Sequence, residues 1–207
     1  MRLCKPEGVM NTRERILIAA ERLLGTGRPD FSMRELAAEA GVSFATPFNQ
    51  FGSKLAIMQA MSAALIAEMH RRFAAAPPAA DAPARVLAAV GVAAGVMLEQ
   101  PAVNRAVMGA IGAPAAEPGT VLAASRALWA AAIGAGAGLA APAYAATVLP
   151  DQLAFGFRGV LSFWTAGELT DADLPVQARK AAAVVLLGFV VPERRDALMA
   201  ILAGAPD

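Results

Sequence analysis

The sequence has few of the residues that several protein classes need. Its single cysteine, Cys4, excludes a disulfide framework, and with His70 as the only histidine a zinc site has too few ligands. One tyrosine, few threonines and no alternating polar and apolar run argue against a β-sandwich or barrel. The chain is also apolar and nearly neutral, with a formal net charge of +1, which excludes disorder.

Alanine is unusually frequent among the 207 residues. It occupies 52 positions, so the 57% hydrophobic content consists largely of methyl groups. Alanine favours helix, and the length allows one large or two small domains with a buried core. We therefore predict an all-α protein.

No segment has the pattern of a targeting or membrane-spanning sequence. Residues 1–10 carry Arg2 and Lys5 but no apolar stretch behind them, unlike a signal peptide. The charge-free run 127–150 contains five glycines and prolines and much alanine, so a buried helix followed by a turn explains it better than a membrane span. We expect a cytoplasmic protein without a membrane partner.

Charge is unevenly distributed along the chain. Residues 1–75 hold ten Lys/Arg against seven Asp/Glu, whereas residues 76–207 hold eight against ten. A basic N-terminal part on a mildly acidic body is typical of a protein whose N-terminal part meets a polyanion.

Capping residues and helix breakers divide the chain into helices. Asn11 or Thr12 begins a helix that ends near Gly25, with Glu14 placed for a capping box if Asn11 is the cap. Ser32 with Glu35 forms the capping box of a short second helix. Ser43 is expected to cap a third helix that ends near residue 51. Further helices are predicted over 54–75, 84–99, 102–112, 118–138, 143–167, 175–191 and 193–203, with a proline-rich hinge over 77–83.

Residues 32–51 have the layout of a helix-turn-helix, two short helices joined by a turn that contains glycine. Ala37 is small where the helices cross, and Gly41 can adopt the left-handed conformation that the turn needs. Val42 packs under the turn, and Ser43 begins the helix that would enter the major groove of DNA. The residues expected to face outward on it are Phe44, Ala45, Thr46, Asn49 and Gln50, with Phe48 and Phe51 shared between surface and core.

The motifs of this region are Thr12-Arg13-Glu14-Arg15-Ile16-Leu17, Ser32-Met33-Arg34-Glu35-Leu36-Ala37, Ala40-Gly41-Val42-Ser43, Thr46, Phe48 and Phe51-Gly52-Ser53-Lys54. Together they resemble the tetracycline-repressor (TetR) family of bacterial regulators. The resemblance implies a DNA-binding head over 9–69, with its helix-turn-helix at 32–51, and a ligand-binding and dimerisation body over 84–207. It also implies a homodimer that releases DNA when a small molecule binds.

The third helix departs from the family pattern at two positions. Phe48 stands where the family usually has a tyrosine that donates to a phosphate, and Pro47 replaces an aliphatic residue and would remove an early helical bond. The helix also lacks Lys and Arg. Base reading would then depend on Thr46, Asn49 and Gln50, because Asn and Gln can bond adenine and a threonine methyl can meet thymine.

Other head residues are candidates for the DNA backbone. The resemblance implies that a DNA phosphate is bound by Lys54 and by the amides that begin the fourth helix. Arg34 is expected to contact the DNA backbone. The alternatives are that Ser43 is only a cap, that Phe51 is only core, and that Lys54 is a solvated charge.

Enzymatic motifs are absent from the sequence. His70 lies mid-helix with no Gly-x-Ser-x-Gly elbow in the chain, and the glycines at 136 and 138 imitate a dinucleotide fingerprint without a preceding strand. Gly52-Ser53-Lys54 lacks the upstream glycine of a phosphate-binding loop. We predict no enzyme, no cofactor and no metal.

The body contains candidates for an apolar ligand pocket, although ordinary core packing is the alternative for each. They are large, uncharged residues spread over several predicted helices: Met97, Leu98, Met108, Ile111, Trp129 and Phe155.

Two body segments are apolar all round, which predicts a partner subunit on one side. Arg158 is the only charge in 152–167, and 181–191 has none. Small and apolar residues there would form a four-helix bundle across a two-fold axis, although the glycines could instead ease packing within one chain. The predicted interface residues are Gly156, Gly159, Val160, Phe163, Gly167, Val184, Val185 and Gly188.

The sequence thus favours a dimeric repressor that a small, largely apolar ligand releases from a palindromic operator in double-stranded DNA. The alternative is an all-helical binding or membrane-surface protein that retains a helix-turn-helix without regulated DNA binding.

Overall fold

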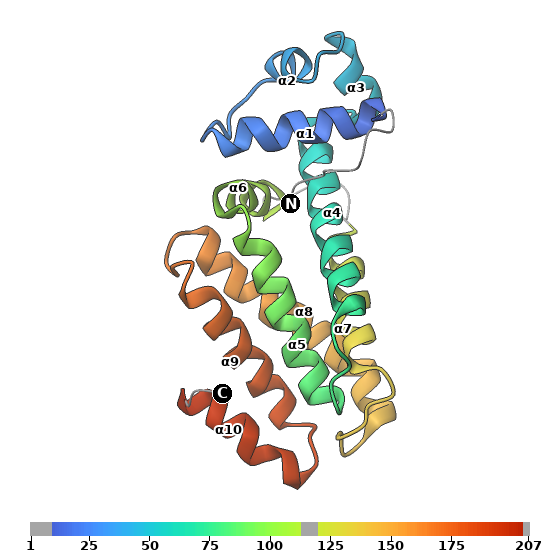
Figure 1. Cartoon of the computed structure of the whole chain (residues 1–207), viewed down its shortest axis with the longest axis vertical. Coiled ribbons are helices and arrows are strands. Elements are labelled where there is room, and N and C mark those ends of the chain that lie inside the picture. The colour runs from blue at the N-terminus through green and yellow to red at the C-terminus, as the bar shows by residue number, and fades with distance from the viewer. Residues whose placement is uncertain (1–9, 113–119, 205–207) are drawn as a thin grey trace.

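The structure is a computed structural model that describes residues 10–112 and 120–204. Over these residues the chain forms ten α-helices and one 3₁₀ helix, and its only β-pairing is an isolated bridge between Leu139 and Val190. The prediction of an all-α fold is confirmed (Figure 1). Residue 9 of the predicted head, residues 118–119 of a predicted helix and residues 205–207 of the predicted body lie outside the described residues.

Three short helices form the head at one end of the molecule (Figure 1). They are α1 (Thr12–Gly25), α2 (Met33–Glu39) and α3 (Ala45–Phe51). Both predicted capping boxes are present: the Asn11 side chain accepts from the Glu14 amide, and the Ser32 side chain accepts from the Glu35 amide. These caps fix where α1 and α2 begin.

The fourth helix, α4 (Lys54–Ala75), joins the head to the body (Figure 1). The Ser53 hydroxyl caps it by accepting from the Ala56 amide. Its buried residues, including Ile57 near the head and Met69 in the body, belong to one continuous hydrophobic core. The proline-rich segment predicted as a hinge lies at the end of α4 remote from the head, so the passage from head to body follows α4 itself.

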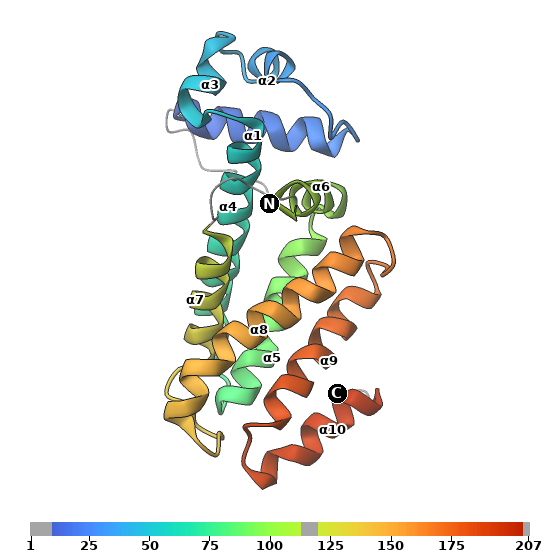
Figure 2. The same ribbon diagram turned by 180° about the vertical axis from the view of Figure 1, so that it is seen from behind.

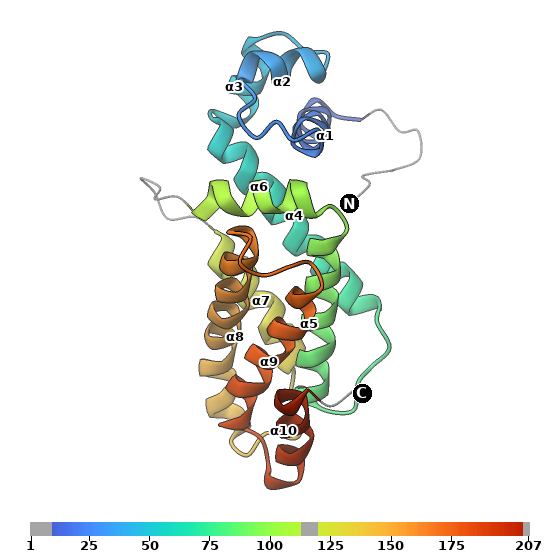
Figure 3. The same ribbon diagram turned by 90° about the vertical axis from the view of Figure 1, so that its left-hand side faces the viewer.

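The remaining helices form the body. In chain order they are α5 (Ala82–Leu98), α6 (Pro101–Gly112), α7 (Val121–Ile133), α8 (Pro142–Thr165), α9 (Asp173–Leu187), a 3₁₀ helix (Pro192–Arg194) and α10 (Arg195–Ala203). Helix α6 lies crosswise between the head and the rest of the body (Figure 3). Helices α8 and α9 pack side by side on one face (Figure 2).

The helix predicted over 118–138 is too long at its C-terminal end. It stops at Ile133, because Gly134, Gly136 and Gly138 all take positive φ angles, of 56°, 75° and 82°, which end a right-handed helix. The charge-free run 127–150 is therefore split between α7, a turn and α8. Among the described residues no single helix has the length and apolar content of a membrane span; only α5 with α6 reaches them together, across a bend of 102°.

An ion-pair network joins the C-terminal part of α4 to the end of α5. Arg71 Nε and Arg72 Nε donate to the Glu68 carboxylate at 2.8 and 2.6 Å, and Arg72 also pairs with Glu99. The hydrogen bond from Arg71, with the contribution of Arg72, lowers the pKa of Glu68 to about 2. Because its folded-state pKa is depressed, Glu68 stabilises the fold above pH 4.5 and loses this effect as the pH falls towards 2.

We predict that Glu68→Gln makes the free energy of unfolding less dependent on pH. Wild-type protein should lose on the order of 1–2 kcal/mol more stability than the variant between pH 7 and pH 3, after allowance for solvent screening. Urea unfolding at both pH values measures this difference. Glu193→Gln, at an exposed glutamate outside the network, is the control; equal pH dependence of Glu68→Gln and wild type would contradict the assignment.

Candidate nucleic-acid interface and internal cavity

Helix α3 presents a polar and aromatic surface to solvent. Phe44, Ala45, Asn49 and Gln50 are exposed, as predicted, whereas Thr46, predicted to face outward, is not. Phe48, predicted to be shared between surface and core, is also exposed. Thr46 and Phe51 are half-buried and Pro47 is buried. The helix thus offers two amide side chains and two aromatic rings on one outward surface.

The start of α3 differs from the prediction. The helix begins at Ala45, and no side chain at the preceding Phe44 caps it. The Ser43 hydroxyl instead shares a 2.7 Å hydrogen bond with the Thr46 hydroxyl. Pro47 is consequently the third residue of α3, where an N–H has no partner within the helix, so the proline removes no helical bond.

The turn between α2 and α3 depends on Gly41 and on a contact from α1. Gly41 has a φ of 63°, which confirms the predicted left-handed turn. Arg15 Nη2 donates to the carbonyl oxygens of Ala40 and Gly41, both at 2.8 Å. A Cβ on Gly41 would lie 3.1 Å from that Nη2 atom, so glycine also leaves room for the arginine.

Two further cations, Arg13 and Lys54, donate hydrogen bonds to backbone groups of the head. Arg13 Nη1 donates to the Gln50 carbonyl oxygen at 2.7 Å, and its guanidinium lies 4.0 Å from the centre of the Phe51 ring. Lys54 Nζ donates to the carbonyl oxygens of Pro29 and Phe31, at 2.6 and 2.9 Å. Lys54 therefore holds the loop between α1 and α2 against the start of α4.

The sequence predicts that Lys54 binds a phosphate, and it does not predict the contacts that Arg13 and Arg15 make with backbone carbonyl groups. The signal that could have identified the two arginines is the carbonyl groups at the ends of α2 and α3, which need donors from elsewhere in the chain.

Among the described residues of the head, Arg34 is a cation whose charge no other group neutralises. Arg22 and Arg28 pair with Glu39 and Glu35, whereas Arg34 has no hydrogen bond or ion pair among the described residues. Its guanidinium lies 5.4 Å from the Phe44 ring centre, and that ring meets Phe48 edge-on with 5.6 Å between centroids. Arg34 and the aromatic pair thus flank the polar residues of α3.

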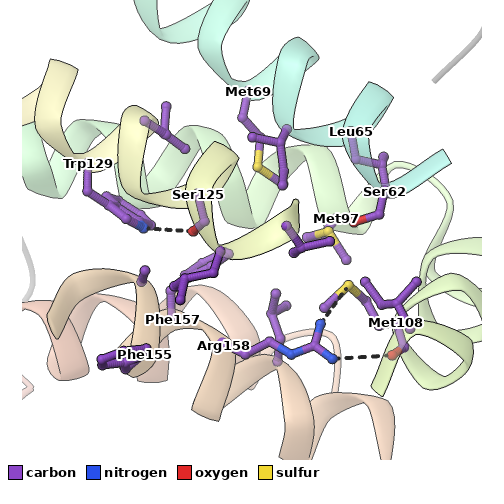
Figure 4. Close-up of a pocket in the computed structure, with 17 residues that line it drawn as sticks. Ser62, Leu65, Met69, Met97, Met108, Ser125, Trp129, Phe155, Phe157 and Arg158 are labelled. Carbon is purple, nitrogen blue, oxygen red and sulfur yellow. Dashed lines mark hydrogen bonds between the residues drawn. The ribbon is translucent and has the colours of Figure 1, made fainter. Parts of the chain in front are cut away.

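The body contains a cavity of about 320 Å³ that is partly open to solvent, since its lining residues Leu122 and Phe155 are 49% and 53% exposed (Figure 4). Five of the six predicted pocket residues line it: Met97, Met108, Ile111, Trp129 and Phe155. Leu98 does not, because it follows Met97 by one helical position and packs half-buried against the core elsewhere. The further lining residues are Ser62, Leu65, Ile66, Met69, Val121, Leu122, Ser125, Leu128, Ala154, Phe157, Arg158 and Leu161.

Polar groups of the cavity are few. Trp129 Nε1 donates to the Ser125 hydroxyl at 3.2 Å, and Arg158 Nη1 lies 3.4 Å from the Met108 sulfur (Figure 4). Sequence reasoning missed the wall that α4 contributes and also missed Arg158. The α4 stripe of Met and Leu has the same spacing whether it faces a core or a cavity, so no local pattern separates the two.

The predicted dimer residues lie on α8 and α9 or at their ends. Phe163 and Val184 are 54% and 59% exposed, and a Cβ on Gly156 or Gly159 would meet no atom within 4 Å. Val160 and Val185 pack half-buried against the core of their own chain. Gly188 is the C-terminal cap of α9.

Gly167 does not belong to α8, although the sequence predicts a helix over 143–167. It lies two residues beyond the last residue of α8 with a φ of 80°, and its amide donates to the Trp164 carbonyl at 3.1 Å. It ends the helix and does not form part of its packing surface.

The described residues thus form a helix-turn-helix head on a helical body that contains a cavity. Residues 16–61 match the model of the family described as bacterial regulatory proteins, tetR family. No curated protein sequence matches the chain. The N-terminal domain therefore belongs to the TetR family of DNA-binding transcription regulators, and the solved structures below show that the whole chain has its fold.

Solved TetR regulators superpose over most of the chain. One from Rhodococcus sp. RHA1 has 22% identity and a TM-score of 0.66, covering 85% of this chain and 94% of its own. One from Shewanella sp. PV-4 has 17% identity and a TM-score of 0.60, with coverages of 88% and 100%. One from Streptomyces coelicolor has 21% identity and a TM-score of 0.50, with coverages of 96% and 91%.

We predict that Lys54→Ala destabilises the fold, because it leaves two carbonyl groups without their donor and removes a cation from the Phe31 ring. The expected loss is about 1–3 kcal/mol in the free energy of unfolding, measured with urea. Arg34→Ala, which removes no internal hydrogen bond, should change stability by no more than about 0.5 kcal/mol. If both variants were equally stable, Lys54 would not be the anchor of the loop.

Proposed function

We propose that the protein is a transcriptional repressor, without enzymatic activity, that binds a palindromic operator as a homodimer. A small, largely apolar ligand in the body cavity would release it from DNA. The observation that carries this proposal is that α4 continues from the DNA-binding head into the cavity wall, where Leu65 and Met69 line the cavity. The DNA-binding unit would be residues 9–69 and the ligand-binding and dimerisation unit residues 84–207, in a cytoplasmic protein that needs no cofactor.

The head would place α3 in the major groove of DNA. The exposed Asn49 and Gln50 would bond base edges, and Thr46 would meet a thymine methyl. Backbone contacts would come from Arg34, Ser43, Phe44, Ala45 and Phe48, and from the start of α4 at Lys54. Because α3 itself carries no cation, Arg34 would be the main electrostatic contact of the described head.

The dimer would form through α8 and α9. Phe155 and Phe163 extend along one side of α8, while Val176 and Val184 extend along one side of α9, and all four are at least half exposed. A partner subunit that covers this face would remove these side chains from water, which the isolated chain cannot do. The two-fold axis would place the two α3 helices on successive turns of DNA, about 34–36 Å apart or at a multiple of that spacing.

The ligand would act on the head through α4 and α6. Helix α6 carries Met108 at the cavity, and the segment that leads into it reaches α1, where Gln100 Nε2 donates to Glu21. A ligand that fits the cavity only when α4 and α6 are displaced would shift the dimer to a state whose heads no longer match the operator. Linkage then requires that operator DNA weakens ligand binding by the same factor.

We predict that Asn49→Ala or Gln50→Ala weakens operator binding by about 1–3 kcal/mol and relaxes preference at one base pair per half-site. Selection from random DNA followed by gel shift measures both quantities. Arg34→Ala is the matched comparison: it should weaken all sequences alike and lower the salt slope by about one. Unchanged base preference in both amide variants would place sequence reading in Thr46 or in DNA shape, and no gel shift by wild type would favour the alternative without DNA binding.

We also predict that Gly159→Glu gives a folded monomer with little DNA affinity, because a charge would be buried at the α8–α9 interface. Sedimentation and gel shift measure the two properties together. Gly95→Glu is the control, since Gly95 is also an exposed helical glycine with open space around it, on α5. A wild-type protein that is monomeric at micromolar concentration would rule the dimer out.

A further inference from the structure

Arg158 is the one feature of the cavity that an apolar ligand does not explain. It is the only charged residue among the described residues that line the cavity (Figure 4). Its Nη1 atom contacts the Met108 sulfur, a weak acceptor, at 3.4 Å, and its Nη2 atom makes only a long contact of 3.5 Å to the Met108 carbonyl oxygen. Among the described residues no carboxylate pairs with it, whereas Arg105 and Arg126 of neighbouring helices pair with Asp171 and Asp151.

Arg158 is half-buried, so the lack of an anionic partner among the described residues has a cost in free energy. The apolar surroundings lower the pKa of Arg158 by desolvation, yet an arginine side chain remains protonated in proteins. A buried cation is stabilised when an anion pairs with it, and the sulfur of a thioether is a weak acceptor. The other polar groups of the cavity are the hydroxyls of Ser62 and Ser125, which carry no charge.

We infer that the ligand of the proposed regulator is an amphipathic carboxylate, whose anionic group binds Arg158 and whose apolar body fills the cavity. A guanidinium matches a carboxylate through two parallel hydrogen bonds. Trp129, Met69 and Met97 line the cavity and provide the apolar surface. At about 320 Å³ it has the volume of roughly ten water molecules, which suits a chain or ring system of about ten carbon atoms.

The same contact gives the ligand a means to act on the head. Arg158 lies on α8 and its present contacts are on α6, at Met108. A carboxylate that binds the guanidinium would break this contact between α8 and Met108 of α6, while Arg105 of α6 would still donate to the Trp164 carbonyl oxygen of α8. Because the chain leading into α6 bonds to Glu21 of α1, this change would reach the head.

The test measures binding of decanoate, 1-decanol and decylammonium, below their aggregation concentrations, by the change in tryptophan fluorescence, to which Trp129 in the cavity wall and Trp164 both contribute. Wild-type protein should bind decanoate about 10- to 100-fold more tightly than decanol and bind decylammonium most weakly. Arg158→Gln should abolish the preference for decanoate and leave decanol affinity unchanged. Arg158→Lys keeps the charge without the planar fork and should retain part of the preference.

Arg126→Gln is the control, because Arg126 is an exposed arginine of α7 that does not line the cavity. Equal affinity of wild type for decanoate and decanol, decanoate preference that survives in Arg158→Gln, or no binding of decanoate would each overturn the inference. Gel shifts keep it separate from the proposed function: a protein that binds decanoate through Arg158 but no DNA is not the proposed regulator, whereas release from DNA by a neutral ligand alone contradicts only the carboxylate.

Discussion

The structure depends on one constraint, which is that α4 must pack in two places at once. Its 22 residues extend about 33 Å at 1.5 Å per residue, long enough to reach from the head into the middle of the body. Ile57 and Met58 are buried near the head, while Leu65 and Met69 are buried beside the cavity. Lys54 fixes the start of the helix to the head, and Arg72 fixes its end to Glu99. A displacement of α4 at one end is therefore transmitted to its other end.

The head uses its cations mainly to hold itself together. Arg13 and Arg15 donate to backbone carbonyl groups at the ends of α3 and α2, and Lys54 donates to carbonyl groups of the loop between α1 and α2. Together with the buried side chains Leu36, Ala37 and Pro47, this arrangement orients α2 and α3, which helices of seven residues could not achieve alone. It also means that the basic composition of the head overstates the positive charge available to a ligand outside it.

Local signals account for the parts of the fold that the sequence predicts well. The capping boxes at Asn11 and Ser32 and the turn at Gly41 each involve residues a few positions apart, so their geometry follows from the sequence. The end of α7 was predicted too late although Gly134 marks it, because the apolar run continues past the glycine.

Tertiary contacts account for what the sequence did not predict. The contribution of α4 to the cavity and the placing of Arg158 beside Met108 depend on residues some 50 positions apart in the chain. The roles of the exposed residues on α3, α8 and α9 depend on molecules outside the chain, so they remain predictions.

The continuity of α4 also limits how such a protein can be recombined. A chimera that joined this head to another sensor body at the proline-rich segment after Ala75 would carry Ser62, Leu65, Ile66 and Met69 with the head. These residues form one wall of the cavity, so the new body would receive a foreign wall and an altered ligand preference. A junction within α4, between Met58 and Ser62, would instead keep each cavity whole. The boundary between the head and the body therefore lies within a helix and not at a loop.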